Sequence, residues 1–191
     1  MKSDVIVIAG QRDRTDAVLA QAERVAEYQK LSPKSTLHLR LLAEEMMSMM
    51  RAITGDVNGE FWIESKGEQY ELHLHVKTAM DFQKRERLLS ASTSGKNEAN
   101  RGLMGKIRAF FEPVEGVPMI LDVSPDGMDS GMVWSMRAYQ QQIQQYVQQN
   151  LTGAAEAWDE LEKSVVAHVA DDVKVSILGR DVEMTIFKKL A

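Results

Sequence analysis

The spacing of apolar residues divides the chain into helical and extended segments. Apolar side chains recur every three or four residues over residues 15–31 and again over residues 35–54, and this period predicts two amphipathic helices. A short apolar run at residues 4–10 predicts a strand ahead of them. The positions expected to face the core from the second helix are Leu39, Leu42, Met46, Met49 and Ile53.

Two pairs of segments alternate between apolar and polar residues, a pattern typical of half-buried strands. Residues 59–65 and 70–76 predict a hairpin that turns at Gly67, and residues 172–178 and 182–187 predict a second hairpin. Alternation leaves one apolar face and one mostly polar face, so we expect helices on the apolar face only. The sequence therefore predicts a two-layer α/β sandwich with a mixed, mostly antiparallel sheet.

A long insertion separates the two hairpins, at about residues 79–152. It is too long for a simple loop and contains helical patterns of its own. Near its end, a Gln-rich helix places apolar residues at the spacing of heptad a and d positions, namely Met136, Tyr139, Ile143 and Tyr146. A further helix is predicted over residues 154–169. At 191 residues, the chain fits one domain that carries this insertion.

Composition excludes several classes of protein. The 44% hydrophobic and 27% charged residues are typical of soluble proteins, and no apolar run approaches the roughly 20 residues that span a bilayer. We expect a cytoplasmic protein, because the first apolar run is too short for a secretory signal. The absence of Cys excludes disulfides and thiolate chemistry. A net charge of −5 argues against general nucleic-acid binding, although residues 77–108 are locally basic.

The order of the predicted elements resembles that of a known family. A helix with a Glu pair, Glu44 and Glu45, is followed by a hairpin, a long insertion, a helix and a second hairpin. This order resembles the GHKL, or Bergerat, ATP-binding domain shared by histidine kinases, gyrase-type ATPases and Hsp90. With the strand and helix at residues 4–31 in front, the chain looks most like the bacterial anti-sigma-factor serine kinases. The resemblance implies an ATP site at the Glu-bearing helix.

In that family, the helix presents a Glu as general base and, four residues later, an Asn that holds the Mg²⁺ bridging the ATP phosphates. The resemblance places the base at Glu45 and puts Met49 where the Asn belongs. A thioether is a poor ligand for a hard cation, so the resemblance leaves ATP as a possible cofactor and Mg²⁺ is not expected. A register moved by one residue gives Glu44 and Ser48 instead. The interpretation we favour for the Glu pair is a solvated helix edge.

The family's other nucleotide motifs are incomplete here. Asp81 follows the first hairpin and would accept from the adenine amino group, but the Gly expected two residues later is missing, and a helix N-cap is the interpretation we favour. Gly153 is the single glycine left from the Gly-rich turn that holds phosphate ahead of the closing helix. Both residues remain candidate nucleotide ligands.

A separate anion site is suggested by the stretch SASTSGKNEANRGLMGKI. Lys96 lies beside Asn97, which can cap a following helix, and Arg101 lies on that helix. The alternative that we favour is a hinged surface loop. His73 and His75 have a spacing that can chelate a metal, but no third ligand accompanies them, so a polar strand face is favoured.

Apolar residues on surfaces expected to meet solvent suggest a partner interface. Trp62, Leu178 and Phe187 fall on the polar face of the sheet. The Gln-rich helix offers a second surface through Tyr139, Ile143 and Tyr146. Either surface would take another protein or a second copy of this chain. Alternatively, the helix folds back over the sheet and leaves a monomer.

These observations predict a regulatory protein that engages a protein partner through a nucleotide-binding type of fold. ATP binding is expected to be weak or lost. The first alternative is an active ATP-dependent serine kinase, and the second is an interaction module that never binds nucleotide. No nucleic-acid or membrane partner is expected.

Overall fold

The computed structural model describes residues 1–9, 14–54, 58–77, 132–151, 153–178 and 181–190. The elements follow one another in the order β1 (Ile6–Ile8), α1 (Thr15–Tyr28), α2 (Pro33–Thr54), β2 (Gly59–Lys66), β3 (Gln69–Lys77), β4 (Met132–Ser135), α5 (Met136–Gln148), α6 (Ala154–Glu162), α7 (Val165–Val169), β5 (Asp172–Leu178) and β6 (Asp181–Lys189).

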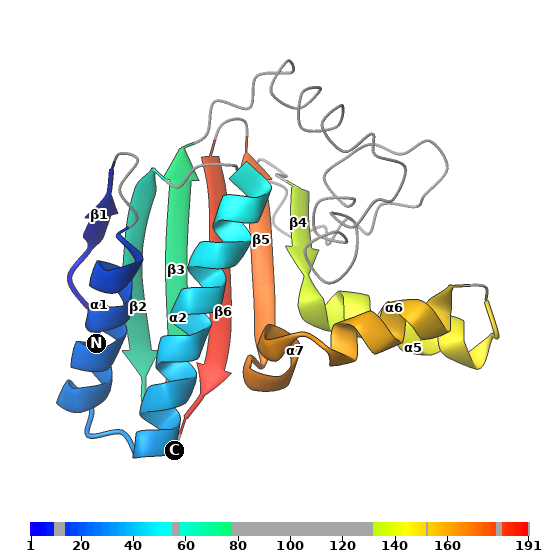
Figure 1. Ribbon diagram of the computed structural model, residues 1–191, viewed down its shortest axis with the longest axis horizontal. Helices are drawn as coiled ribbons and strands as arrows, with labels where there is room; N and C mark the ends of the chain where they lie inside the picture. Colours follow the sequence, from blue (N-terminus) through cyan, green and yellow to red (C-terminus); the bar gives the residue numbers. More distant parts are fainter. Residues whose placement is uncertain (10–13, 55–57, 78–131, 152, 179–180, 191) are drawn as a thin grey trace.

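The described strands form one sheet in the order β1-β2-β3-β6-β5-β4, and each pair of neighbours is antiparallel. The two predicted hairpins, β2–β3 and β5–β6, meet where β3 pairs with β6. Helices α1 and α2 lie side by side on one face of this sheet (Figure 1). The fold is therefore the two-layer α/β sandwich that the alternation of apolar residues predicts.

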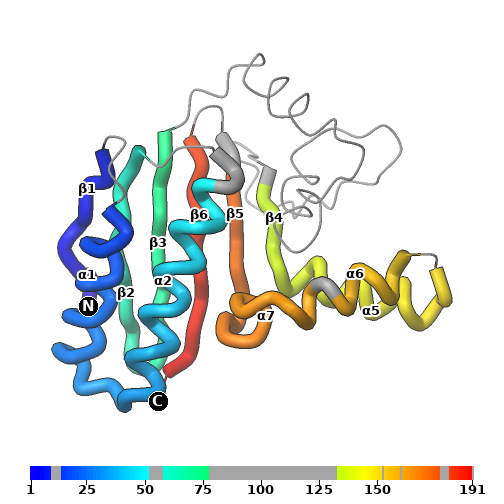
Figure 2. Tube along the Cα trace, viewed as in Figure 1, coloured from blue at the N-terminus to red at the C-terminus, as the bar shows by residue number. Residues whose placement is uncertain are grey.

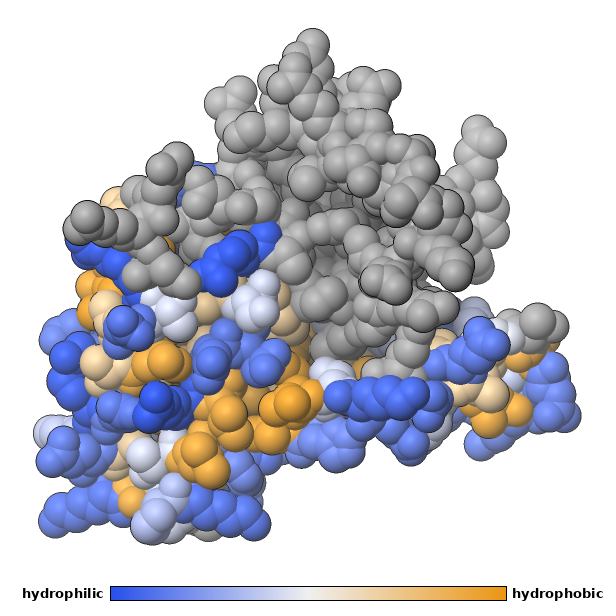
Figure 3. Space-filling model, viewed as in Figure 1, coloured by the Kyte–Doolittle hydropathy of each residue, from blue (hydrophilic) through white to orange (hydrophobic). Residues whose placement is uncertain are grey.

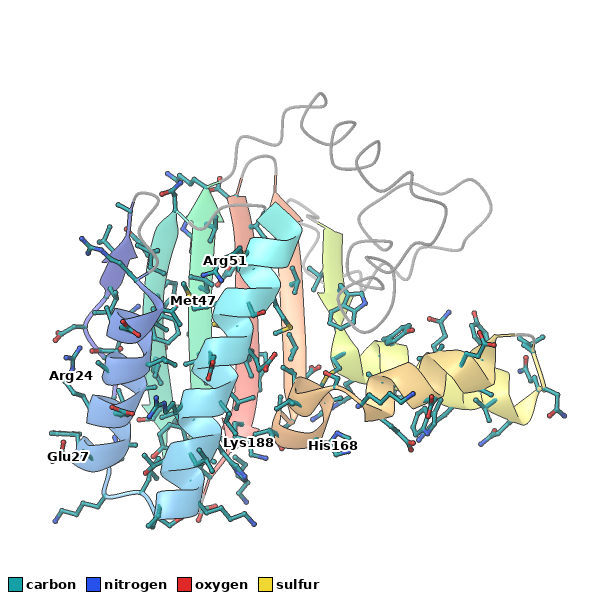
Figure 4. All side chains as sticks on the ribbon, in the orientation of Figure 1. Arg24, Glu27, Met47, Arg51, His168 and Lys188 are labelled. Atoms are coloured by element: carbon teal, nitrogen blue, oxygen red, sulfur yellow. The ribbon has the colours of Figure 1, made fainter. Side chains whose placement is uncertain are left out.

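The core fills the space between α2 and the sheet. Its largest fully buried side chains come from alternate strand positions and from α2: Phe61, Ile63, Leu72, Leu74, Met184, Leu39, Leu42, Met46, Met47 and Met50, with Met136 at the start of α5. Met47 points from α2 into this interior (Figure 4). The predicted buried positions at Leu39, Leu42, Met46 and Met49 are confirmed, whereas the side chain of Ile53 is outside the described residues. The buried stripe is wider than predicted, because Ala43, Met47 and Met50 also face the core.

Strand β1 is an edge of the described sheet, and side chains from the N-cap and the first half of α1 cover the backbone in and just before it. The carbonyl oxygen of Val7 accepts a hydrogen bond from Arg14 Nη1 at 3.1 Å, and that of Asp4 accepts from Gln21 Nε2 at 3.1 Å. Unpaired carbonyl groups at a sheet edge invite pairing with another strand. These two side chains satisfy both carbonyl groups within the chain, so they are not free for a partner's strand.

The single helix predicted over residues 154–169 is wrong. The chain forms two helices, α6 and α7, because Ser164 adopts an extended backbone and caps α7, its Oγ accepting from the backbone N–H of Ala167 at 3.4 Å. Helices α5 and α6 form an arm (residues 136–162) that projects sideways from the sheet (Figure 2). The predicted Gln-rich helix is confirmed as α5, and the sequence pattern does not predict strand β4, which is only four residues long.

Asp172 anchors the arm to the sheet. This carboxylate is 7% exposed and accepts hydrogen bonds from the backbone N–H of Arg137 at 3.0 Å and from Ser135 Oγ at 3.2 Å. Ser135 in turn caps α5, since its side chain accepts from the backbone N–H of Ala138. A negative charge at a helix N-terminus is favourable, so Asp172 holds the start of α5 against β5.

Candidate functional site

The two nucleotide-site candidates on α2 differ in exposure. Met49 is 3% exposed and belongs to the hydrophobic core, whereas Glu45, one turn earlier, is only partly buried. Burial raises the pKa of the Glu45 carboxyl, and the neighbouring Glu44 raises it further. The position that would supply an oxygen ligand for Mg²⁺ thus holds a thioether packed among apolar side chains.

The structure does not bring Gly153 to these residues. Gly153 is the N-cap of α6, with a φ of +81°, and lies at the outer end of the arm, whereas Glu45 lies in the middle of α2 over the sheet (Figure 1). The remaining candidates, Asp81, Lys96, Asn97 and Arg101, lie outside the described residues, as does the whole of residues 78–131.

The face of the sheet opposite α1 and α2 carries a chemically richer set of side chains, which we call the outer sheet face. Its central members on β2, β3, β5 and β6 are Glu60, Trp62, Glu64, Glu71, His73, His75, Lys174, Ser176, Asp181, Glu183, Thr185 and Phe187. They alternate with the buried residues along each strand, and each is exposed or partly buried. This is the face on which the sequence places Trp62 and Phe187; the side chain of Leu178 is outside the described residues.

A lysine ammonium group lies over each of the two aromatic rings, Trp62 and Phe187, on the outer sheet face. Lys2 Nζ lies 4.7 Å from the centre of the Trp62 ring, and Lys174 Nζ lies 5.4 Å from the centre of the Phe187 ring. Such cation–π contacts contribute about 0.5–1 kcal/mol each at exposed sites. Trp62 Nε1 also donates to Glu64 at 2.9 Å, and this bond, with the one from Lys2, lowers the pKa of the Glu64 carboxyl.

His73 lies at the centre of the outer sheet face and is more enclosed than the predicted polar face implies. Its ring stacks on Trp62 with centroids 4.9 Å apart and planes 4° apart, which leaves 13% of the side chain exposed. Nδ1 lies 3.3 Å from Thr185 Oγ1. Nε2 lies 3.4 Å from Glu71 but in poor hydrogen-bonding geometry, so this buried nitrogen has no hydrogen-bond partner among the described residues.

Only histidines lie within ion-pair distance of Glu71, Asp181 and Glu183 among the described residues. Glu71 and Glu183 lie 3.4 and 3.8 Å from His73, and Asp181 lies 2.9 Å from His75. A histidine balances a carboxylate only when it is protonated. Within the described residues no group of three or more His, Cys, Asp or Glu side chains could hold a metal ion. The centre of this face is therefore acidic when the histidines are neutral.

The second predicted interface, on the Gln-rich helix, is partly covered by the chain itself. Ile143 is 3% exposed, Tyr139 packs against the core with its ring 6.1 Å from Trp134, and the Tyr146 hydroxyl accepts from Gln142 at 2.6 Å. A separate apolar patch lies on the helix layer, where Leu37 of α2 and Val165 of α7 are 54% and 45% exposed. Figure 3 shows apolar surface gathered between α2 and α7.

No family model, curated protein or solved structure matches this chain. Among the described residues, none of the helices combines the length and apolar character needed to cross a membrane.

Proposed function

We propose that this chain is a cytoplasmic regulatory protein that acts by binding a protein partner through its outer sheet face. The observation that carries the proposal is the pair of aromatic residues, Trp62 and Phe187, lying only partly buried on the face opposite the helices. Large aromatic side chains on a surface favour protein interfaces, where their area is removed from water.

The proposal includes a nucleotide site of the GHKL type that is weak or lost. Two features support this part: the buried thioether of Met49 one turn after Glu45, and the separation of Gly153 from α2 by the length of the arm. Mg²⁺ needs oxygen ligands, so any ATP that binds does so with little help from the metal. Calorimetric titration with ATP, with and without Mg²⁺, tests this point. A tenfold gain with Mg²⁺, about 1.4 kcal/mol, contradicts it.

Photo-crosslinking tests the partner surface directly. Ser176 is neutral, partly exposed and lies on the outer sheet face opposite Glu183. A photoreactive benzoylphenylalanine in its place is expected to give a covalent adduct with one discrete protein in the cells that make this chain. The absence of an adduct from this face contradicts the proposal.

One observation favours a second candidate, an ATP-dependent serine kinase. The raised pKa of Glu45 brings this carboxyl closer to the value that suits a general base. A kinase of this kind transfers the γ-phosphoryl group to a serine hydroxyl and loses that activity in Glu45→Gln. If the parent incorporates phosphate from labelled ATP and Glu45→Gln does not, the kinase is supported. If neither the parent nor Glu45→Gln incorporates phosphate, the partner-binding function is favoured.

A further inference from the structure

We propose that the partner segment bound by the outer sheet face is basic, rich in Lys and Arg. The inference rests on the proposed function and specifies the chemistry of the partner. It follows from the charge and the aromatic residues of the face, which are independent features of the structure.

The face carries five carboxylates, Glu60, Glu64, Glu71, Asp181 and Glu183, against the three lysines Lys2, Lys77 and Lys174, so negative charge is in excess. Glu64 is already paired with Lys2 at 3.2 Å, which leaves four carboxylates on three neighbouring strands. Glu60, Glu71, Asp181 and Glu183 lie on β2, β3 and β6, and the register sets Glu60 and Glu183 on either side of His75. Glu71, Asp181 and Glu183 are 41–48% exposed, and Glu60 is exposed with no interaction partner among the described residues. Neighbouring strands lie about 4.8 Å apart, well within the ~10 Å Debye length at 0.1 M salt, so the fields of these carboxylates add.

The aromatic residues show what kind of group the face accepts. Trp62 lies on β2 and Phe187 on β6, and a lysine ammonium group of this chain lies over each ring. Lys2 and Lys174 are thus occupied at the two rings, and Lys77 lies opposite Asp181 in the strand register. Within ion-pair distance, Glu71, Asp181 and Glu183 have only histidines in the described part of the chain. A partner's Lys or Arg would place its charged group at these carboxylates and its alkyl stem against the face.

The other candidate occupants fit less well. Nucleic acid and other polyanions would meet like charge at Glu71 and Glu183. The apolar patch of Leu37 and Val165 on the helix layer has no comparable feature that selects one partner. Charge complementarity therefore favours a basic protein segment on the outer sheet face.

The test measures the binding of fluorescein-labelled deca-lysine by fluorescence anisotropy at pH 7.5 and about 0.01 M salt, where the Debye length is about 30 Å. The paired change Glu71→Gln and Glu183→Gln removes two charges from the face. The control, Glu44→Gln and Glu156→Gln, removes two charges from exposed helix positions. We expect the first variant to bind at least tenfold more weakly than the parent, and the control to change affinity less than twofold. Equal weakening of the two variants, or no binding by the parent, overturns the inference.

Circular dichroism of both variants separates loss of binding from loss of fold. The altered side chains on the sheet are 41% and 48% exposed, so both variants are expected to fold like the parent. If the outer-face variant unfolds, the single change Glu60→Gln replaces it, because Glu60 has no partner in the described structure to lose.

Crosslinking from position 176 distinguishes the two proposals. If an adduct forms from that position but deca-lysine binds equally well without the charges of Glu71 and Glu183, the outer sheet face is still a partner surface and the inference of a basic partner is wrong. If no adduct forms and deca-lysine does not bind, the partner surface and the basic partner are both wrong.

Discussion

Trp62 on β2 and His73 on β3 lie directly opposite each other in the strand register, and their rings stack in nearly parallel planes 4.9 Å apart. Cross-strand aromatic pairs of this kind stabilise a sheet and fix its register. The same pair lies on the outer sheet face beside the carboxylates of the proposed binding surface, so this contact contributes both to the stability of the fold and to the shape of that surface.

Removing the Trp62 ring is expected to destabilise the protein moderately. Trp62→Ala deletes the stack on His73, the contact with Lys2 and the hydrogen bond to Glu64, and we expect a loss of about 1–2 kcal/mol in the free energy of unfolding. Urea denaturation measures this loss. Tyr28→Ala is the control, because Tyr28 is 75% exposed. A loss no larger than that of the control would show that the stack contributes nothing.

Placing an amide at position 49 is expected to damage the core. Met49 is 3% exposed among apolar side chains, so Met49→Asn buries a polar group without a designed partner and costs about 2–4 kcal/mol. Ser48→Asn, on the exposed side of the same helix, is expected to change stability by less than about 0.5 kcal/mol. If Met49→Asn has the same free energy of unfolding as the parent and gains Mg²⁺-dependent ATP binding, position 49 faces a nucleotide site and not the core.

Glu45 is expected to lower stability at neutral pH. Because the folded state raises the pKa of this carboxyl, its charged form is disfavoured there, and stability falls as pH rises from the ordinary value of 4.5 through the raised pKa. Glu45→Gln should therefore be more stable than the parent at pH 7, by less than about 1 kcal/mol, with the gain disappearing below pH 4. Thermal melting across this range checks the prediction. A gain that persists in acid would come from packing rather than charge.

His38 is expected to make the protein sensitive to mild acid. Burial lowers the pKa of His38, and so do Lys188, beside the first turns of α2 (Figure 4), and Lys34. The unfolded chain takes up a proton at His38 at a higher pH than the folded chain does. The contribution of neutral His38 to the free energy of unfolding is therefore complete above pH 6.5 and is lost as pH falls from 6.5 through the lowered pKa. His38→Gln should lose less stability than the parent between pH 7.5 and 5.5. Equal losses would assign the acid sensitivity to other groups.

The sequence predicts the two layers of this fold because burial follows simple periods. Leu72 and Leu74 alternate with His73 along β3, and the structure buries the first two completely. Local patterns fail where a single polar side chain decides a boundary. Ser164 has an extended backbone just after the end of α6 and caps α7, within a segment whose apolar spacing continues without a break.

The candidate site could be predicted less well than the fold, because its properties depend on pairings between strands. Trp62, His73 and Thr185 are far apart in sequence and meet only through the register of β2, β3 and β6. Neither the enclosure of His73 nor the lysines above Trp62 and Phe187 leaves a pattern in the local sequence. An alternating strand shows which residues share a face, but not which of them touch.

Site-specific crosslinking tests the central claim most directly, because it reports which surface of the folded chain meets another protein. One form carries benzoylphenylalanine in place of Ser176, on the outer sheet face, and the other carries it in place of Tyr28, on α1. The account predicts a discrete adduct from position 176, none from position 28, and loss of the first adduct when Trp62 is changed to Ala. Adducts that form equally from both positions, or only from position 28, would contradict a partner surface on the sheet.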